Sequence, residues 1–96
     1  MTATFFEAAQ EEFEEAIRYY ERQRTKLGDD FRAEVQKALD KICNHPGAWT
    51  DLGNGVRRCR TDRFPYGLVY FVEGDEAYIV AVMHLHRDPG YWRDRI

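Results

Sequence analysis

Two histidines, His84 and His86, stand two positions apart at the end of an apolar segment, and they are the side chains best suited to proton transfer. On an extended strand, residues two apart project from the same face of a sheet. Histidine exchanges protons near neutral pH, so the pair could act as a general acid or base. A metal site would need a third ligand, and the other histidine, His45, lies at a predicted helix end. We expect no metal site, and the simpler interpretation is a polar pair on the open face of the sheet.

The basic residues of the second half are the other chemical signal. Every lysine or arginine within residues 49–96 is an arginine, whereas the first half also contains lysines. The planar guanidinium suits carboxylate or phosphate, so this half predicts a surface for a polyanion or an acidic peptide. Surface solvation explains the composition equally well, and the net charge of −3 argues against broad nucleic-acid binding. The candidates for binding a partner or target are Arg57, Arg58, Arg60, Trp92 and Arg93.

The two signals could meet in one basic patch. On an uninterrupted strand, a single face would carry Tyr78, Val80, Val82, His84 and His86. If the sheet curves at this end, the histidines approach the arginines of residues 56–59, with Tyr66, Tyr91 and Trp92 nearby. Such side chains can stack on bases, hold phosphate and move protons. The alternative is that Tyr91 and Trp92 pack the tail onto the core, and we favour it for Trp92.

The elements that position these residues can be inferred from periodicity. Residues 2–5 predict a short strand that runs into a helix near Glu7. Gly28 is the predicted end of this helix, Asp29 or Asp30 the cap of a second helix, and Pro46 its end. Apolar stripes at helical spacing indicate the buried faces, which are Ala9, Phe13, Ala16, Ile17 and Tyr20, then Phe31, Val35, Ala38, Leu39 and Ile42. Acidic residues that include Glu11, Glu12, Glu14 and Glu15 occupy the rest of the first helix.

The second half predicts strands. Residues 51–55 (DLGNG) indicate a turn, residues 56–59, 66–73 and 77–85 indicate strands, and Gly74-Asp75 indicates a hairpin. The last two strands are apolar on both faces, which is typical of the centre of a covered sheet. The predicted fold is α+β, with an N-terminal short strand and an α-helical hairpin packed on a small antiparallel β-sheet.

Length and composition fit a single domain over residues 1–96. Hydrophobic residues make up 44% and charged residues 32%, close to globular averages. No apolar run approaches the roughly 18 residues of a membrane-spanning helix, and the acidic N-terminus lacks the basic start of a signal peptide. We therefore expect a soluble, cytoplasmic protein. No P-loop, GxSxG or paired-carboxylate motif is present, so neither a cofactor nor a small-molecule substrate is indicated.

Three stretches of the sequence carry a resemblance when taken together. They are AIRYYERQRTKLGDDFRAEVQKALDKICNHP, RRCRTDRFPYGLVYFV and IVAVMHLHRDPGYWRDR. In this order, over nearly the whole chain, they resemble the RelE/ParE family of type II toxin–antitoxin toxins, often labelled plasmid stabilisation proteins. The most specific motifs are Arg-Phe-Pro-Tyr and His-x-His-Arg-x-Pro-Gly-Tyr-Trp. The resemblance implies the same fold, a helical hairpin on a small antiparallel sheet.

The resemblance implies two branches of activity. RelE-like members are ribonucleases that cut mRNA on the ribosome, whereas ParE-like members inhibit DNA gyrase by binding it. The nuclease branch often has an arginine just before the Leu-Val-Tyr of the middle strand, where this chain has Gly67. This departure removes a group that would stabilise the scissile phosphate. The candidates for a variant ribonuclease site are Arg63, His84, His86, Arg87 and Tyr91. In such a site His86 or Tyr91 would activate a 2′-hydroxyl, and Arg63 and Arg87 would hold the phosphate.

We therefore expect a ParE-like toxin that acts by binding DNA gyrase. The resemblance also implies a cognate antitoxin, which folds a C-terminal segment over the toxin and neutralises it. The alternatives are a ribosome-dependent mRNA endonuclease and a non-toxic member that only binds its partner. Whether the chain is an enzyme depends on which of these holds.

Overall fold

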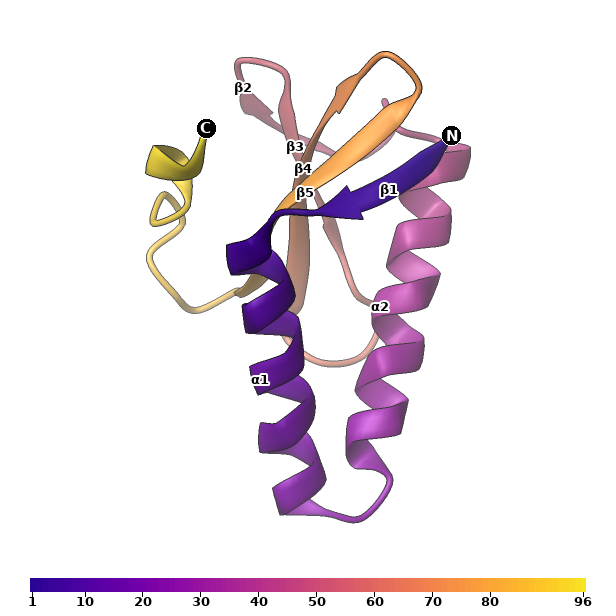
Figure 1. Cartoon of the computed structure of the whole chain (residues 1–96), viewed down its shortest axis with the longest axis vertical. Helices are drawn as coiled ribbons and strands as arrows, with labels where there is room; N and C mark the ends of the chain where they lie inside the picture. The colour runs from indigo at the N-terminus through magenta and orange to yellow at the C-terminus, as the bar shows by residue number, and fades with distance from the viewer.

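Five strands form one sheet, and a hairpin of two helices lies against one face of it (Figure 1). The computed structural model describes all residues, 1–96. In chain order the elements are β1 (Thr2–Phe5), α1 (Glu7–Gln23), α2 (Leu27–Asn44), β2 (Thr50–Gly53), β3 (Val56–Arg60), β4 (Tyr66–Glu73), β5 (Glu76–His84) and a short 3-10 helix, η1 (Arg93–Arg95). The predicted α+β class and the helical hairpin are confirmed. No helix of the chain is both long and apolar enough to cross a membrane.

The sheet has the strand order β1-β5-β4-β3-β2, so the first and last strands of the chain are neighbours. The pairs β3–β4 and β4–β5 are antiparallel, as expected; β2 adds an antiparallel pair with β3, and β1 adds a parallel pair with β5. The predicted hairpin at Gly74-Asp75 joins β4 to β5, and both strands are flanked on each side. Both faces of β4 and β5 are apolar because other parts of the chain cover each face of the sheet.

The turn predicted over residues 51–55 is wrong for its first part. Thr50–Gly53 form the edge strand β2, in which Asp51 pairs with Arg57 and Gly53 with Val56. Only Asn54 and Gly55, both with positive φ, form the hairpin tip, beside Gly53 with φ 93°. The strand escaped prediction because it is short, largely exposed and has no apolar alternation.

The end of the first helix was also predicted wrongly. α1 ends at Gln23 and α2 already begins at Leu27, so neither Gly28 nor an aspartate cap marks the boundary. The left-handed residue between the helices is Lys26, with φ 74°. Gly28 has another purpose: a Cβ there would lie 2.8 Å from the carbonyl oxygen of Ile17 in α1. The glycine therefore allows the two helices to approach closely at the start of α2.

The helices and the sheet enclose the larger of two apolar clusters. Both predicted stripes contribute to it, with Ala9, Ala16, Phe31, Val35, Ala38 and Ile42 from the helices against Leu68, Tyr70 and Ile79 from the sheet. Aromatic rings extend this cluster toward the β3–β4 loop, where Phe64 lies 5.2 Å from Phe31 and 4.7 Å from Tyr20 between ring centroids.

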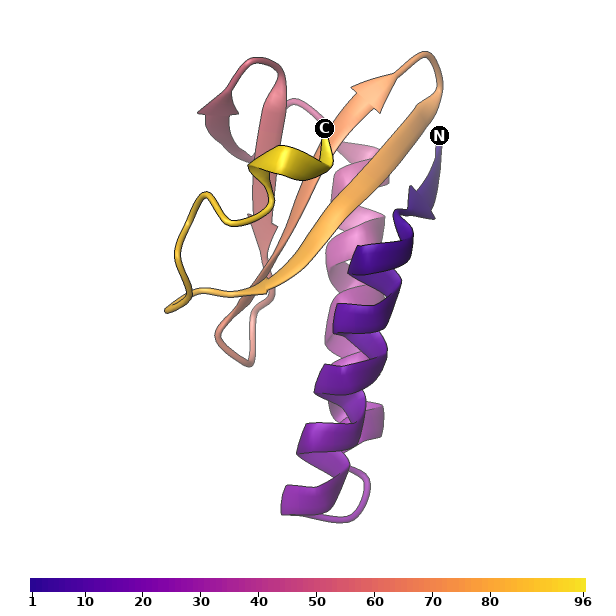
Figure 2. The same cartoon turned by 60° about the vertical axis from the view of Figure 1, so that its left-hand side comes forward.

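The tail, residues 85–96, covers the opposite face of the sheet from α2 (Figures 1 and 2). Trp92 is fully buried there against Val56, Val69, Val80, Ala81 and Met83. The interpretation that Trp92 packs the tail onto the core is confirmed. The sheet is therefore covered on one face by the helices and on the other by the tail.

A β-bulge in β5 changes which side chains share a face. Tyr70 pairs with Ile79 and Val69 with Ala81, so Val80 is an extra residue. Ile79 and Val82 consequently lie in the cluster under the helices, whereas Val80 and Ala81 lie under the tail. The prediction that Tyr78, Val80, Val82, His84 and His86 share one face is therefore wrong, because one inserted residue inverts the alternation that follows it.

Trp92→Ala should destabilise the fold by about 3–5 kcal/mol, because it removes a fully buried indole. Urea unfolding followed by circular dichroism measures this loss. Ile96→Ala is the matched control in the same tail; its side chain is exposed, so we expect a change within about 0.5 kcal/mol. Equal small losses in both variants would show that the tail does not pack on the sheet.

Candidate functional site

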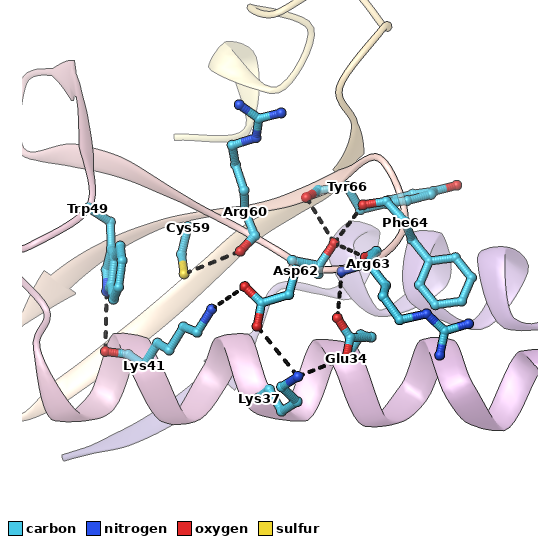
Figure 3. Close-up of polar contacts among 11 residues, drawn as sticks. Glu34, Lys37, Lys41, Trp49, Cys59, Arg60, Asp62, Arg63, Phe64 and Tyr66 are labelled. Atoms are coloured by element: carbon cyan, nitrogen blue, oxygen red, sulfur yellow. Dashed lines mark hydrogen bonds and ion pairs between the residues drawn. The ribbon is translucent and has the colours of Figure 1, made fainter.

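A hollow lined by basic side chains opens where β3, the β3–β4 loop and the segment after β5 meet. Arg58, Arg60 and His86 line it together with residues of that loop, and its volume is about 370 Å³. We call it the basic hollow. Arg58 and Arg60 are two apart on β3 and project from one face. Figure 3 shows that Arg60 extends away from α2, on the other side of the sheet from Lys41 and Asp62.

Arg58 and Gly67 depend on each other. A Cβ at position 67 would lie 2.9 Å from both Cγ and Cδ of Arg58, which is closer than packed carbon atoms approach. The arginine stem therefore occupies the space that a side chain on Gly67 would need. The Nε of Arg58 is buried and has no hydrogen-bond partner. The nuclease branch often has an arginine at position 67. Here that position carries no side chain, and the stem of a different arginine, Arg58, lies over it.

Arg58 and Arg60 have no ion-pair partner within the chain, although Asp62 also lines the basic hollow. None of the salt bridges in the structure involves Arg58 or Arg60. The nearby carboxylate of Asp62 instead binds Lys41 at 2.7 Å and Lys37 at 3.4 Å, on the α2 side (Figure 3). The hydrogen bond from Lys41 lowers the pKa of Asp62, which keeps this carboxylate charged and committed to the lysines.

The β3–β4 loop that borders the hollow is fixed to α2. The backbone N–H of Arg63 donates to Oε1 of Glu34 at 2.7 Å, and Glu34 also pairs with Lys37 at 3.1 Å (Figure 3). The Arg63 hydrogen bond is the main reason that the pKa of Glu34 is lowered. Within the loop, the hydroxyl of Thr61 lies 2.6 Å from the carbonyl oxygen of Arg63 and 2.9 Å from that of Phe64. These contacts hold Phe64 in a left-handed conformation, with φ 69°.

A second polar centre surrounds Glu12 of α1, whose side chain is only 15% exposed. Its carboxylate accepts hydrogen bonds from the Tyr91 hydroxyl at 2.7 Å and from both terminal nitrogens of Arg95 at 3.0 Å. The backbone N–H of Val82 donates to it as well, at 3.0 Å, and Arg87 lies 3.5 Å away. Glu12 therefore joins α1, the edge of β5 and the tail through one charged group.

Sequence reasoning missed Glu12, which was placed among the exposed acids of the first helix. Helical periodicity could not distinguish it, because Glu11, Glu14 and Glu15 surround it with the same side chain. The one signal available was the tail, where Arg87, Tyr91 and Arg95 supply several donors but only Asp88 and Asp94 supply acidic acceptors. Such a segment needs an acceptor from elsewhere in the chain.

Tyr91, one of the candidate catalytic residues, is held as a hydrogen-bond donor to Glu12. Burial is the largest cause that raises its pKa, followed by its hydrogen bond to the Glu12 carboxylate. The guanidinium of Arg87 lies over its ring at 3.6 Å, so both residues belong to the Glu12 centre. A phenol in this environment stays protonated at physiological pH, which makes it a poor general base.

The two histidines connect the Glu12 centre to the basic hollow. The ring centroids of His84 and His86 lie 5.1 Å apart, and Nδ1 of His84 accepts from the backbone N–H of His86 at 3.1 Å. His84 packs edge-on against Tyr66 and lines a separate hollow of about 300 Å³ with Glu12 and Arg87. His86 faces the basic hollow instead. No group of three His, Cys, Asp or Glu side chains is arranged to hold a metal ion.

The remaining candidates lie apart from these centres. The guanidinium of Arg63 lies beside Asp30 of α2 at 3.7 Å, on the side of the loop away from the basic hollow (Figure 3). Arg57 donates to the carbonyl oxygen of Trp49 at 2.8 Å. Arg93 stacks on Trp92, whose ring is buried. The structure therefore brings together Arg58, Arg60 and His86, and separately His84, Arg87 and Tyr91.

Glu12→Gln should lower the free energy of unfolding by about 1.5–3 kcal/mol, because it weakens several hydrogen bonds to a charged acceptor at once. Urea unfolding measures the loss, and faster amide hydrogen exchange in residues 87–96 should accompany it. Glu11→Gln makes the same change at the exposed neighbouring position and should stay within about 0.5 kcal/mol. If the two variants behave alike, Glu12 does not hold the tail.

Glu34→Gln should make the stability less sensitive to acid. The pKa of Glu34 is lowered in the folded chain, so the unfolded chain binds more protons below about pH 5 and the contribution of Glu34 is lost as the pH falls. The free energy of unfolding between about pH 7 and pH 3 should therefore fall less steeply in the variant. Glu11→Gln should retain the wild-type slope, and an unchanged slope in Glu34→Gln would contradict the assignment.

Comparison with known proteins places the chain in a family. A family model described as the ParE toxin of type II toxin-antitoxin systems (parDE) matches residues 4–89. A chain in the solved structure of the chromosomal ParDE toxin–antitoxin system from P. aeruginosa has a similar fold, with a TM-score of 0.65 and 15% sequence identity. The similarity covers 90% of this chain and 97% of that chain. No curated protein matches this sequence.

The fold and the family match agree with the motifs found in the sequence, from the helical hairpin to the histidine pair at the end of β5. The chain belongs to the ParE toxin family of type II toxin–antitoxin systems.

Proposed function

We propose that this ParE-type toxin stops bacterial growth by binding DNA gyrase and that a cognate antitoxin neutralises it. In this proposal the chain recognises a protein surface and catalyses no bond cleavage. The type II toxin–antitoxin family to which it belongs supports the antitoxin partner. The choice of target depends on the groups that the candidate site contains.

The absence of a side chain at position 67 is the observation that favours binding over cleavage. Cleavage of a phosphodiester needs a donor or cation beside the phosphate as negative charge develops on it. In the nuclease branch that the sequence resembles, an arginine often stands at this position. Here Gly67 lies beneath the stem of Arg58, so an arginine at 67 would displace the packing already present. The middle of the sheet face therefore lacks that catalytic group.

Two further observations weigh against a ribonuclease built from the candidate residues. The phenol of Tyr91 donates to Glu12 and its pKa is raised, so it does not accept a proton from a 2′-hydroxyl. Arg63 pairs with Asp30 on the α2 side, so it does not share a phosphate with His86. Of the residues assigned to base and phosphate binding, Arg87 and Tyr91 lie in contact, but Tyr91 is held as a donor to Glu12.

One observation favours the alternative, an mRNA endonuclease. His86 lines the same hollow as Arg58 and Arg60, so a group able to exchange protons stands near two unpaired cations. This combination is suited to general base catalysis on RNA. A test of the proposal must therefore measure both gyrase inhibition and RNA cleavage.

Purified chain should inhibit DNA supercoiling by gyrase and leave mRNA intact in a translating extract. The first assay follows conversion of relaxed plasmid to its supercoiled form as the chain is titrated, and the second maps transcript ends in the extract. In cells, induction of the chain should produce DNA damage signalling before protein synthesis falls.

The opposite pattern would overturn the choice of target. Cut transcripts with unaffected supercoiling would establish the endonuclease, and the double variant His86→Gln with Tyr91→Phe should then abolish the cutting. A chain that neither arrests growth nor inhibits either process would be a member that only binds its partner.

A further inference from the structure

The basic hollow is lined by Arg58, Arg60 and His86, and Asp62 is the one acidic residue in its lining. The carboxylate of Asp62 binds Lys41 and Lys37, and Glu34 of α2 binds Lys37 and the backbone N–H of Arg63 (Figure 3). Arg58 and Arg60 have no acidic partner within the chain. An internal structural role as ion-pair partners therefore does not account for these arginines.

Arg58 carries the clearest sign of a missing ligand. Its stem is packed on Gly67, which restricts where the guanidinium can lie. Its Nε is buried without an acceptor, and buried donors of a charged group are costly when they have no partner. Arg58 also lines the hollow, so an oxygen acceptor that enters it would meet this guanidinium and bind the part of the fork that remains accessible.

The walls of the hollow indicate which acceptor fits. Phe64, Pro65 and Leu85 form apolar wall beside the cations, and the volume of about 370 Å³ is near the lower end for ligand pockets. A carboxylate on a short aliphatic stem uses both features, since the stem contacts the apolar wall and the oxygens meet Arg58 and Arg60. A guanidinium binds a carboxylate through two parallel hydrogen bonds.

The charge of the chain as a whole favours a peptide over a nucleic acid. The chain has a net charge of −3, and α1 presents exposed Glu11, Glu14 and Glu15. A polynucleotide places phosphates along its whole length and gains affinity from an extended basic surface, which this molecule does not provide. A peptide can place one carboxylate in the hollow and keep its other side chains clear of the acids.

We propose that the basic hollow of Arg58, Arg60 and His86 binds a glutamate or aspartate side chain of an acidic segment in a protein partner. This inference extends the proposed function. It rests on that function in one respect: the acidic segment belongs to a protein that the toxin recognises. It assigns the hollow as the anchoring point of that segment. It requires neither gyrase inhibition nor any cleavage of RNA.

A direct test uses the full chain and a short fluorescein-labelled peptide rich in glutamate and leucine. Fluorescence anisotropy should show saturable binding, and the same peptide with glutamine in place of glutamate should bind at least about tenfold more weakly. Arg58→Met keeps an unbranched stem over Gly67 and removes the guanidinium, and Arg60→Gln removes the neighbouring charge. Each should weaken binding by about tenfold or more.

Arg32→Gln is the matched control, since it removes one positive charge from an exposed position of α2 away from the hollow. It should change the peptide affinity by less than about twofold. Thermal unfolding of each variant shows whether it folds. If Arg58→Met does not fold, the peptide affinity of Arg60→Gln alone decides whether the hollow is the binding site. Equal weakening in Arg32→Gln would overturn the site and leave only general charge attraction.

Two other outcomes would also overturn the proposal. A chain that binds neither peptide lacks the site. Tighter binding of a short single-stranded RNA than of the peptide, lost in Arg58→Met and steeply dependent on salt, would assign the hollow to phosphates instead. These results are independent of the supercoiling assay, so failure of this site and failure of the gyrase proposal can be distinguished.

Discussion

The hydrogen-bonded pair of Glu12 and Arg95 is the interaction on which the arrangement of this molecule depends. β1 ends at Phe5, and beyond it the edge of β5 has no partner strand. The guanidinium of Arg95 donates to the Val80 carbonyl at 2.9 Å, and the N–H of Val82 donates to Glu12. A helix and the tail thus satisfy, with side chains, the edge groups that another strand would have paired. Because the same pair holds the tail, Trp92 can cover the outer face of the sheet.

The helices and the tail cover the two faces of the sheet but leave one end of it open. At that end, the ion pairs of the β3–β4 loop lie on the α2 side. The Asp62 carboxylate of the β3–β4 loop binds the lysines of α2, whereas Arg60 of β3 extends to the opposite face of the sheet (Figure 3). Arg58 and Arg60 line the basic hollow together with Asp62. The contacts that fix the loop thus also bind its carboxylate to lysines rather than to these arginines.

A fold by itself does not determine what its site does. In this chain the stem of Arg58 packs over Gly67, at the position where the nuclease branch that the sequence resembles often has an arginine, and its Nε is buried. Tyr91 is likewise occupied, because its hydroxyl serves the structure by donating to Glu12. Tyr91 and Arg87 are thus held at the Glu12 centre, whereas Arg58, Arg60 and His86 line the basic hollow.

The types and order of most elements could be inferred from the amino-acid sequence. Apolar residues at helical spacing placed α1 and α2, and continuous apolar runs placed β4 and β5, because these patterns reflect burial within a single segment. Local patterns failed where burial was slight, as in β2, or where one residue was inserted, as at Val80 in β5. The motifs also indicated the family and the arginine-rich surface.

Which of these side chains act together depended on the packing of the whole chain. It directed His84 and His86, whose rings lie 5.1 Å apart, into different hollows, placed Arg63 on the α2 side, and selected Glu12 from a run of glutamates as the partner of Tyr91, which lies 79 positions away. Such choices depend on contacts between distant segments, and no local periodicity encodes them. A carboxylate in an acidic helix looks the same in the sequence whether it faces water or a buried arginine, because only the packed chain brings the arginine to it.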